Sequence, residues 1–164
     1  MSPMMKKGLA VCALHLAIIG SLGAKLLVDR ATRPRVWARA APVDPNLPIR
    51  GRYVSLRVEA VPGPGWDRQR ALWKVELGDQ EGRLTAAPSE TSDLTAHIIE
   101  RGGERVAVVD QPLAFFIPEH VADPSRRPAG EELWVEVTIP RAGRPRPIRL
   151  GVRKDGQLTP LALN

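Results

Sequence analysis

The first strong pattern in the sequence is an apolar run over residues 8–28, GLAVCALHLAIIGSLGAKLLV, which follows Lys6 and Lys7. A helix over this run would be about 31 Å long at ~1.5 Å per residue, which is enough to cross a bilayer. The run is apolar on all sides, whereas a surface helix of a globular domain has one polar face. Its polar interruptions are His15, Ser21 and Lys25. We therefore predict that residues 1–28 form a membrane anchor in contact with the lipid bilayer.

A cleavable signal peptide is the main alternative for this segment. Ser21 and Gly23 are small and correctly spaced for cleavage before Ala24. Residues 25–28, however, continue the apolar stretch beyond that point. This continuation favours an uncleaved signal-anchor.

The charges on the two flanks of the run disagree about topology. Lys6 and Lys7 favour a cytoplasmic N-terminus, but several arginines between residues 30 and 39 favour the cytoplasm for the other flank. Signal-anchors usually export a long C-terminal domain. We therefore predict an N-terminus inside the cytoplasm and a C-terminal domain outside it.

Beyond the anchor the pattern changes twice. Residues 29–50 contain four prolines among several arginines and show no hydrophobic period, which predicts a semi-extended tether. In residues 51–164, apolar and polar positions alternate over short segments, which is typical of β-strands with one buried face. We predict strands at 52–59, 71–77, 83–86, 94–100, 105–110, 113–117, 132–139, 147–154 and 158–163.

Two glycine-containing turns give the clearest topological signals. Gly102-Gly103 and Asp155-Gly156 each separate two predicted strands, and such dipeptides favour tight antiparallel hairpins. Many short strands with frequent turn residues predict a mainly β domain, either one antiparallel β-sandwich or a partly open barrel. The whole chain would then be a single N-terminal transmembrane helix followed by this exported domain.

Composition narrows the classes of function. The chain has 164 residues, including 16 Pro and 14 Gly, which excludes a helical bundle. Cys12 is the single cysteine, so a disulfide scaffold and a multi-thiolate metal site are excluded, and we predict no metal or cofactor. The net charge is +6, but three lysines precede residue 29 and the remainder carries only +3. Without a concentrated basic face, we predict no nucleic-acid partner.

The search for catalytic chemistry finds only weak candidates. The sequence lacks G-x-S-x-G, H-E-x-x-H, Walker and Rossmann motifs. His97 lies in a predicted strand, and the adjacent Glu119 and His120 would point to opposite faces of a strand. Ser55 and Lys74 are the one pair with the residue types of the serine–lysine dyad of membrane signal peptidases. We predict no catalytic residue and favour a non-enzymatic protein.

Two short motifs connect the chain with a family. Residues 51–58, GRYVSLRV, resemble the motif that names the GDYXXLXY family, and residues 115–119, FFIPE, are similar to an aromatic-aliphatic-Pro-Glu element later in that family. Arg52 and Val58 depart from the pattern, so a role that needs the motif aspartate is not carried over. The matching residues, which are our candidate interaction residues, are Gly51, Tyr53, Leu56, Pro118 and Glu119.

The resemblance implies a membrane-anchored, exported bacterial protein without an assigned activity. Members are often encoded beside polytopic membrane proteins, which implies a polytopic partner and a location in the inner (cytoplasmic) membrane.

The matching residues allow a structural and a functional interpretation. In the structural one, Gly51 permits an unusual backbone conformation, Tyr53 packs against a neighbouring strand, and Leu56 belongs to the core. Pro118 would end a strand and Glu119 would cap the next segment. In the functional one, the Tyr53 and Glu119 side chains meet in a small polar site that binds a partner or ligand.

We therefore predict a non-enzymatic, single-pass envelope protein whose β-domain is an accessory module for an integral membrane partner. Small residues at Gly20, Ser21 and Gly23 would let a partner helix approach closely.

Two alternatives remain open. The first is a periplasmic binding domain for a small molecule or polysaccharide, which exposed tryptophans beside arginines would favour, with Trp66, Trp73 and Trp134 as the candidates. The second is a signal-peptidase-like hydrolase, which requires Ser55 and Lys74 within hydrogen-bond reach.

Overall fold

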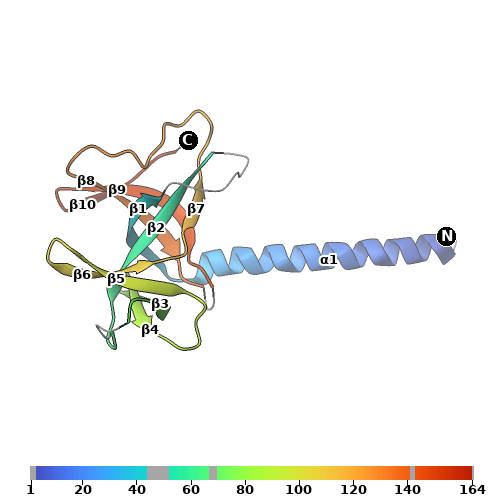
Figure 1. The fold of residues 1–164 in the computed structure, drawn as a ribbon. Helices are drawn as coiled ribbons and strands as arrows, with labels where there is room; N and C mark the ends of the chain where they lie inside the picture. Colours follow the sequence, from blue (N-terminus) through green and yellow to red (C-terminus); the bar gives the residue numbers. More distant parts are fainter. Residues whose placement is uncertain (1–2, 44–51, 67–69, 141–142, 164) are drawn as a thin grey trace. The chain divides into compact units, whose positions relative to one another are not determined.

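The computed structural model describes residues 3–43, 52–66, 70–140 and 143–163. The chain divides into two compact units, Met1–Arg33 and Pro34–Asn164, which are described separately. The first is a single helix and the second contains all the strands (Figure 1).

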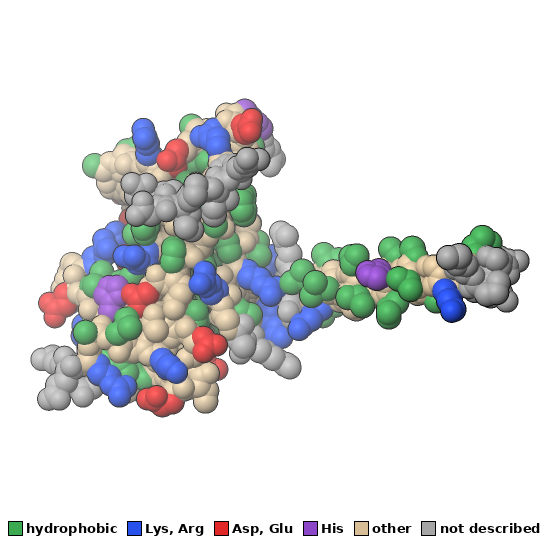
Figure 2. Space-filling view, turned by 45° about the vertical axis from the view of Figure 1, so that its right-hand side comes forward, with side chains coloured by type: hydrophobic (Ala, Val, Ile, Leu, Met, Phe, Trp, Pro, Cys, Tyr) green, Lys and Arg blue, Asp and Glu red, His purple; other side chains and the backbone are tan. Residues whose placement is uncertain are grey.

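The helix α1 spans Pro3–Thr32 and contains the apolar stretch Lys7–Val28. Apolar side chains cover the face of this helix seen in Figure 2, and none of the stretch is buried. His15 Nδ1 lies 2.8 Å from the carbonyl oxygen four residues earlier, and Ser21 Oγ donates to the one three residues earlier at 2.8 Å. Such internal bonds satisfy polar side chains where water is absent. The predicted helix is confirmed, and its length and composition suit a membrane span or a signal sequence.

The second unit is built from ten described strands. They are β1 (Arg35–Val43), β2 (Tyr53–Pro62), β3 (Trp73–Gln80), β4 (Arg83–Pro88), β5 (Thr95–Arg101), β6 (Glu104–Val109), β7 (Leu113–Phe116), β8 (Glu131–Thr138), β9 (Arg146–Lys154) and β10 (Gln157–Pro160).

Six of these strands close a barrel in the order β1-β2-β6-β5-β3-β4. Neighbours in this order pair antiparallel, whereas β4 returns to β1 in parallel through one residue pair, Trp37↔Arg83. Strand β4 also pairs with β2 in parallel, at Val61 and Pro62. Strands β8, β9 and β10 extend the sheet outward from β1, and β7 pairs with β2. The predicted mainly β, antiparallel fold is confirmed, and the barrel is closed.

The structure differs from the prediction over residues 29–50. The helix continues to Thr32, and Arg35–Val43 forms strand β1 rather than a tether. Val36, Ala38 and Ala40 are buried and alternate with more exposed residues, which is the pattern of a half-buried strand. Strand β8 pairs only with residues 35–39 of β1, so Pro42 has a neighbouring strand, β2, on one side only. A strand position with one free side tolerates proline. Residues 44–50 lie outside the described residues.

One hydrophobic core fills the barrel and continues under the β8–β9 extension. Leu56, Leu84 and Leu150 are its largest fully buried side chains, with valines from β1, β2, β3, β6 and β8 packed around them. Both predicted glycine hairpins are present, since β5 pairs with β6 and β9 with β10 across them. Asp155 and Gly156 have φ angles of 49° and 81°, the left-handed conformation that such two-residue turns require.

Candidate functional site

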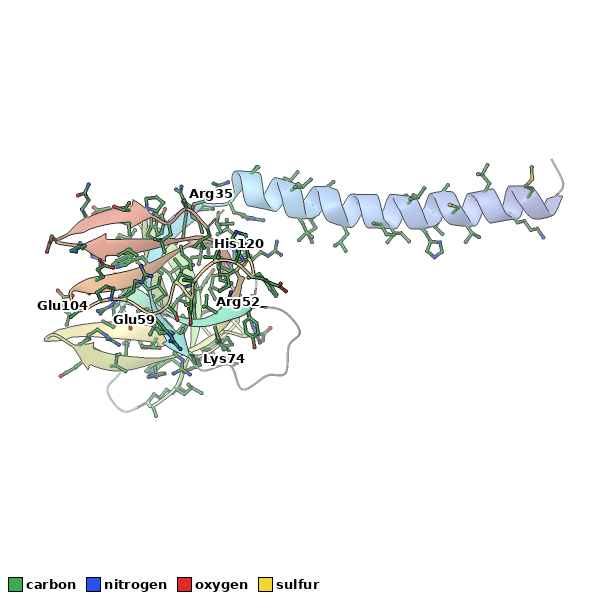
Figure 3. The ribbon with its side chains drawn as sticks, turned by 90° about the horizontal axis from the view of Figure 1, so that it is seen from above. Arg35, Arg52, Glu59, Lys74, Glu104 and His120 are labelled. Carbon is green, nitrogen blue, oxygen red and sulfur yellow. The ribbon has the colours of Figure 1, made fainter. Side chains whose placement is uncertain are left out.

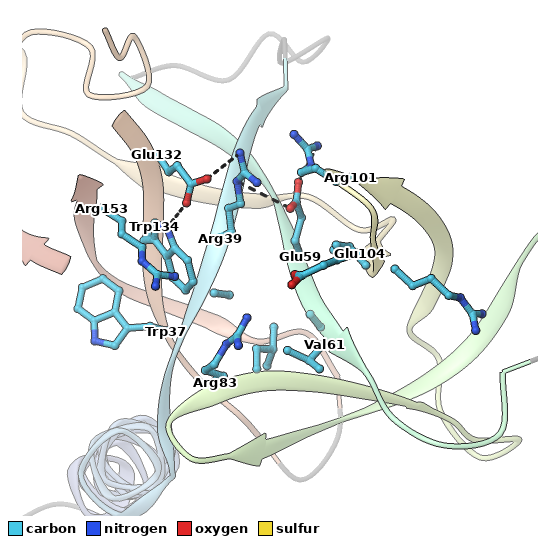
Figure 4. A pocket seen from close by; sticks show the side chains of 15 residues that line it. Trp37, Arg39, Glu59, Val61, Arg83, Arg101, Glu104, Glu132, Trp134 and Arg153 are labelled. Atoms are coloured by element: carbon cyan, nitrogen blue, oxygen red, sulfur yellow. Dashed lines mark hydrogen bonds and ion pairs between the residues drawn. The ribbon is translucent and has the colours of Figure 1, made fainter. Parts of the chain in front are cut away.

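A groove of about 460 Å³ opens where strands β1 and β2 separate. The β1–β2 ladder ends at Arg39↔Glu59, after which β1 pairs with β4 at Trp37 and β2 pairs with β4 at Val61. Side chains from these strands and from β5, β6, β8 and β9 line the opening (Figure 4). The groove therefore lies beside the strand contact of the barrel with the fewest paired residues, the single pair that joins β1 to β4.

A buried carboxylate forms part of the groove wall. The Glu59 side chain is only 5% exposed, and its Oε1 lies 2.9 Å from Nη2 of Arg101. Its Oε2 lies 3.9 Å from Nε of Arg39. A buried charge is tolerated only when paired, so the two guanidiniums explain how Glu59 can remain at this position.

The same network extends to a tryptophan. Nη2 of Arg39 lies 3.1 Å from Oε1 of Glu132, whose Oε2 accepts a hydrogen bond of 3.2 Å from Trp134 Nε1. The guanidinium of Arg153 lies over the Trp134 ring, 5.2 Å from its centroid. These contacts fix the indole at the edge of the groove, as the dashed lines in Figure 4 show for the polar ones.

A second indole, Trp37, is held between strands. A Cβ atom placed on Gly151 would lie 2.9 Å from Cζ3 of Trp37 and 3.1 Å from the Thr159 carbonyl oxygen. The guanidinium of Arg149 covers the Trp37 ring at 5.4 Å and is itself bound by Glu136, 2.8 Å from its Nε. The absence of a side chain at Gly151 thus makes the space that the indole occupies.

Replacing Gly151 by alanine is expected to destabilise the barrel by about 1–3 kcal/mol, because the added methyl overpacks Trp37 and a backbone oxygen. Urea unfolding of the full chain in a mild detergent, followed by tryptophan fluorescence, measures the change. All four tryptophans lie beyond α1, so the signal reports on the β-unit. Gly78→Ala is the matched control: its Cβ would meet only the Thr85 hydroxyl, which can rotate away. An equal loss in both variants would contradict the explanation.

The predicted motif residues lie away from this groove. The strands β2 and β7 pair in register, with Tyr53 opposite Phe116, and their ring centroids are 6.1 Å apart. The Arg52 guanidinium donates to the backbone carbonyl of Glu119. Arg52 lies toward one end of the barrel in Figure 3 and Glu104, at the groove, toward the other. The two motifs are therefore neighbours in space, joined by the β2–β7 pairing, by the two aromatic rings and by the Arg52 side chain.

Their individual positions differ. Leu56 is fully buried in the core, whereas Pro118 and Glu119 are exposed. Gly51 lies outside the described residues. The described contact with Glu119 comes from Arg52, at the position where the sequence departs from the family motif.

A small hollow of about 200 Å³ adjoins Tyr53 and contains Ser55, Asp123 and Ser125. Partial burial acts to raise the pKa of Asp123, but hydrogen bonds from the Ser125 N–H and hydroxyl, with the nearby Arg126 and Arg52 charges, hold that pKa below its ordinary value. The carboxylate is therefore satisfied locally and stabilises the loop after β7.

The residues considered for catalysis are dispersed. His97 Nδ1 lies 2.7 Å from Oδ1 of Asp110, a pair that joins β5 to the end of β6. Ser55 is buried on β2, whereas Lys74 is exposed on β3, and these strands do not pair with each other. In the parts of the chain that the structure describes, no three His, Cys, Asp or Glu side chains are placed to hold a metal ion.

Comparisons with protein-family models, curated proteins and solved structures find no match for this chain. The resemblance to the GDYXXLXY family thus stays a prediction, and the groove is interpreted from its own residues.

Most of the groove was not predicted from the sequence. Trp37 and Arg39 fall in the predicted tether, although the alternation of Val36, Ala38 and Ala40 around them indicates a strand. Trp134 was singled out from the sequence and lines the groove, but it is 7% exposed and so does not meet the expectation of an exposed tryptophan. The other two candidate tryptophans, Trp66 and Trp73, pack edge-on at 5.7 Å and are half-buried against the core.

Proposed function

We propose that the chain is a single-pass membrane protein whose β-barrel is an interaction module for an integral membrane partner and performs no reaction of its own. The observation that carries the proposal is the helix α1. Along Lys7–Val28 its apolar side chains are all exposed. Apolar surface of this length is stable in a lipid bilayer, and only a structure that satisfies its own backbone, such as a helix, can cross one.

The location and orientation belong to the same proposal. Lys6 and Lys7, together with the long domain that follows the helix, support an N-terminus in the cytoplasm and a barrel outside it, anchored in the inner membrane. The resemblance to the GDYXXLXY family supports a polytopic membrane protein as the partner.

A second candidate function, a binding domain for a small molecule or polysaccharide, is favoured by the groove. Its two indoles each lie within 5.4 Å of a guanidinium, a combination that suits ligand binding. The signal-peptidase-like alternative has less support, since the exposed Lys74 and the buried Ser55 stand on strands that do not pair.

In vivo crosslinking tests the proposal. The full chain, expressed from its own locus with a C-terminal tag, is crosslinked, solubilised gently and purified. We expect a polytopic membrane protein to co-purify in stoichiometric amount. Recovery of the protein alone, in the membrane fraction, would contradict the accessory function.

The double variant Gly20→Leu/Gly23→Leu is expected to reduce the captured partner severalfold, because bulky side chains prevent close approach of a second helix. A Cβ at either position meets no atom of the chain within 4 Å, so the substitutions leave the fold intact. Gly8→Leu, at an equally open position of the same helix, is the matched control. The measurement is the partner-to-bait ratio after crosslinking, with tryptophan fluorescence to check the barrel. An unchanged ratio in the double variant would rule out packing through this face.

A further inference from the structure

We propose that the groove between β1, β2 and β4 is a binding site for a small multivalent anion that bears carboxylate or phosphate groups. The inference goes beyond the proposed membrane partnership and rests on the barrel alone. The groove is lined by five arginines and three glutamates, an excess of two positive charges. These are Arg39, Arg83, Arg101, Arg105, Arg153, Glu59, Glu104 and Glu132.

The charges are not equally available to a ligand. Glu59 and Glu132 already bind Arg39 and Arg101 at the distances given above, and the Glu59 side chain is almost completely buried. Two carboxylates and two guanidiniums therefore form a neutral network that holds the wall of the groove. A ligand would meet this network as a rigid support rather than as free charge.

Three guanidiniums remain. The side chains of Arg83 on β4, Arg105 on β6 and Arg153 on β9 form no ion pair or hydrogen bond with any other residue that the structure describes. Among the three glutamates that line the groove, Glu104, at the start of β6, is the one whose side chain likewise has no ion pair or hydrogen bond with a described residue. Because one negative charge offsets only one of the three positive charges, the available groups favour an anion.

Arg153 is also positioned for recognition. Its guanidinium lies 5.2 Å from the centre of the Trp134 ring, and the hydrogen bond from Trp134 Nε1 to Glu132 fixes that ring. A guanidinium that lies over an aromatic face keeps its N–H groups available at its edge. The aromatic contact thus reduces the freedom of Arg153 without using its hydrogen-bond donors.

The dimensions fit a small ligand. A volume of about 460 Å³ lies within the range of small-molecule sites, ~300–1,000 Å³. The planar fork of arginine matches carboxylate and phosphate oxygens equally well, so anionic charge with paired oxygen acceptors is the shared chemistry. The unpaired arginines come from three different strands, which favours a ligand with more than one anionic group.

Titration of the full chain in a non-ionic detergent tests the site. Citrate serves as the carboxylate probe and pyrophosphate as the phosphate probe, with sodium chloride at matched ionic strength as the reference. Calorimetry measures binding, and tryptophan fluorescence reports on the indole beside Arg153. We expect saturable binding of at least one probe, weakened about tenfold or more by Arg83→Gln and by Arg153→Gln.

Arg146→Gln is the matched control, because Arg146 is exposed on the same strand as Arg153 and does not line the groove. It removes the same charge from the molecule as a whole. Binding of citrate alone would assign carboxylate chemistry, and binding of pyrophosphate alone would assign phosphate chemistry. Saturable binding of neither probe, or equal weakening by Arg146→Gln, would overturn the proposal. Capture of a membrane partner is measured separately, so either proposal can fail without the other.

Discussion

Replacing Arg39 and Arg101 together by leucine is expected to lower the free energy of unfolding by about 3–5 kcal/mol. Both guanidiniums bind Glu59, whose side chain is 5% exposed, so their removal leaves a buried carboxylate with no partner. The loss exceeds that expected for Glu59→Gln alone, because the two arginines are 33% and 42% exposed and can be hydrated when the carboxylate is absent. Urea unfolding of the full chain in detergent, followed by tryptophan fluorescence, measures both variants.

A rescue experiment separates lost charge pairing from lost packing. Adding Glu59→Gln to the double variant removes the unpaired charge and is expected to restore much of the stability. The triple variant would then be more stable than the double variant, a non-additive result that independent sites do not give. If the third substitution destabilises the barrel further, the buried ion pair is not what the arginines contribute.

Leu56→Ala is expected to cost about 2–5 kcal/mol of unfolding free energy, because it leaves a cavity in a core that can collapse only in part. Leu56 is fully buried on β2, the strand that contacts β1, β4, β6 and β7. The same urea titration measures the effect. Leu72→Ala provides the control, since Leu72 is 55% exposed and its truncation is expected to change the stability by less than about 0.5 kcal/mol. Similar losses in both variants would show that Leu56 is not central to the core.

The sequence allowed much of the fold to be predicted, for identifiable physical reasons. Alternating residues such as Leu133, Val135 and Val137 face the core and are buried, and the two glycine hairpins lie where their dipeptides indicate. The failure at residues 35–43 came from weighting proline and arginine over alternation. A proline can end a paired stretch without excluding a strand, and arginines can lie on its outer face.

The groove was harder to predict, because it depends on long-range pairing. Glu59 follows a clean alternating pattern, and the residues next to it in the sequence do not indicate that Arg39 and Arg101 contact it in the fold. Those residues come from three strands, and the register of each strand decides which side chains converge. The two motif segments were identified from the sequence, but the pairing of Tyr53 with Phe116 was not predicted, since it too depends on strand register.

The place of β1 in the sheet has a consequence for how the chain folds as it is made. One edge of β1 pairs with β2, which follows within some twenty residues, but the other edge pairs with β8, which ends only at Thr138. During synthesis from the N-terminus, that second edge of β1 stays unpaired until almost the whole domain has left the ribosome. Contacts so distant in sequence slow folding, and an unpaired edge invites pairing with other chains. The pairing of this second edge is therefore a late event, even though the six barrel strands have all been made by Val109. A nascent chain that stalls before β8 is an aggregation hazard until β8 is made.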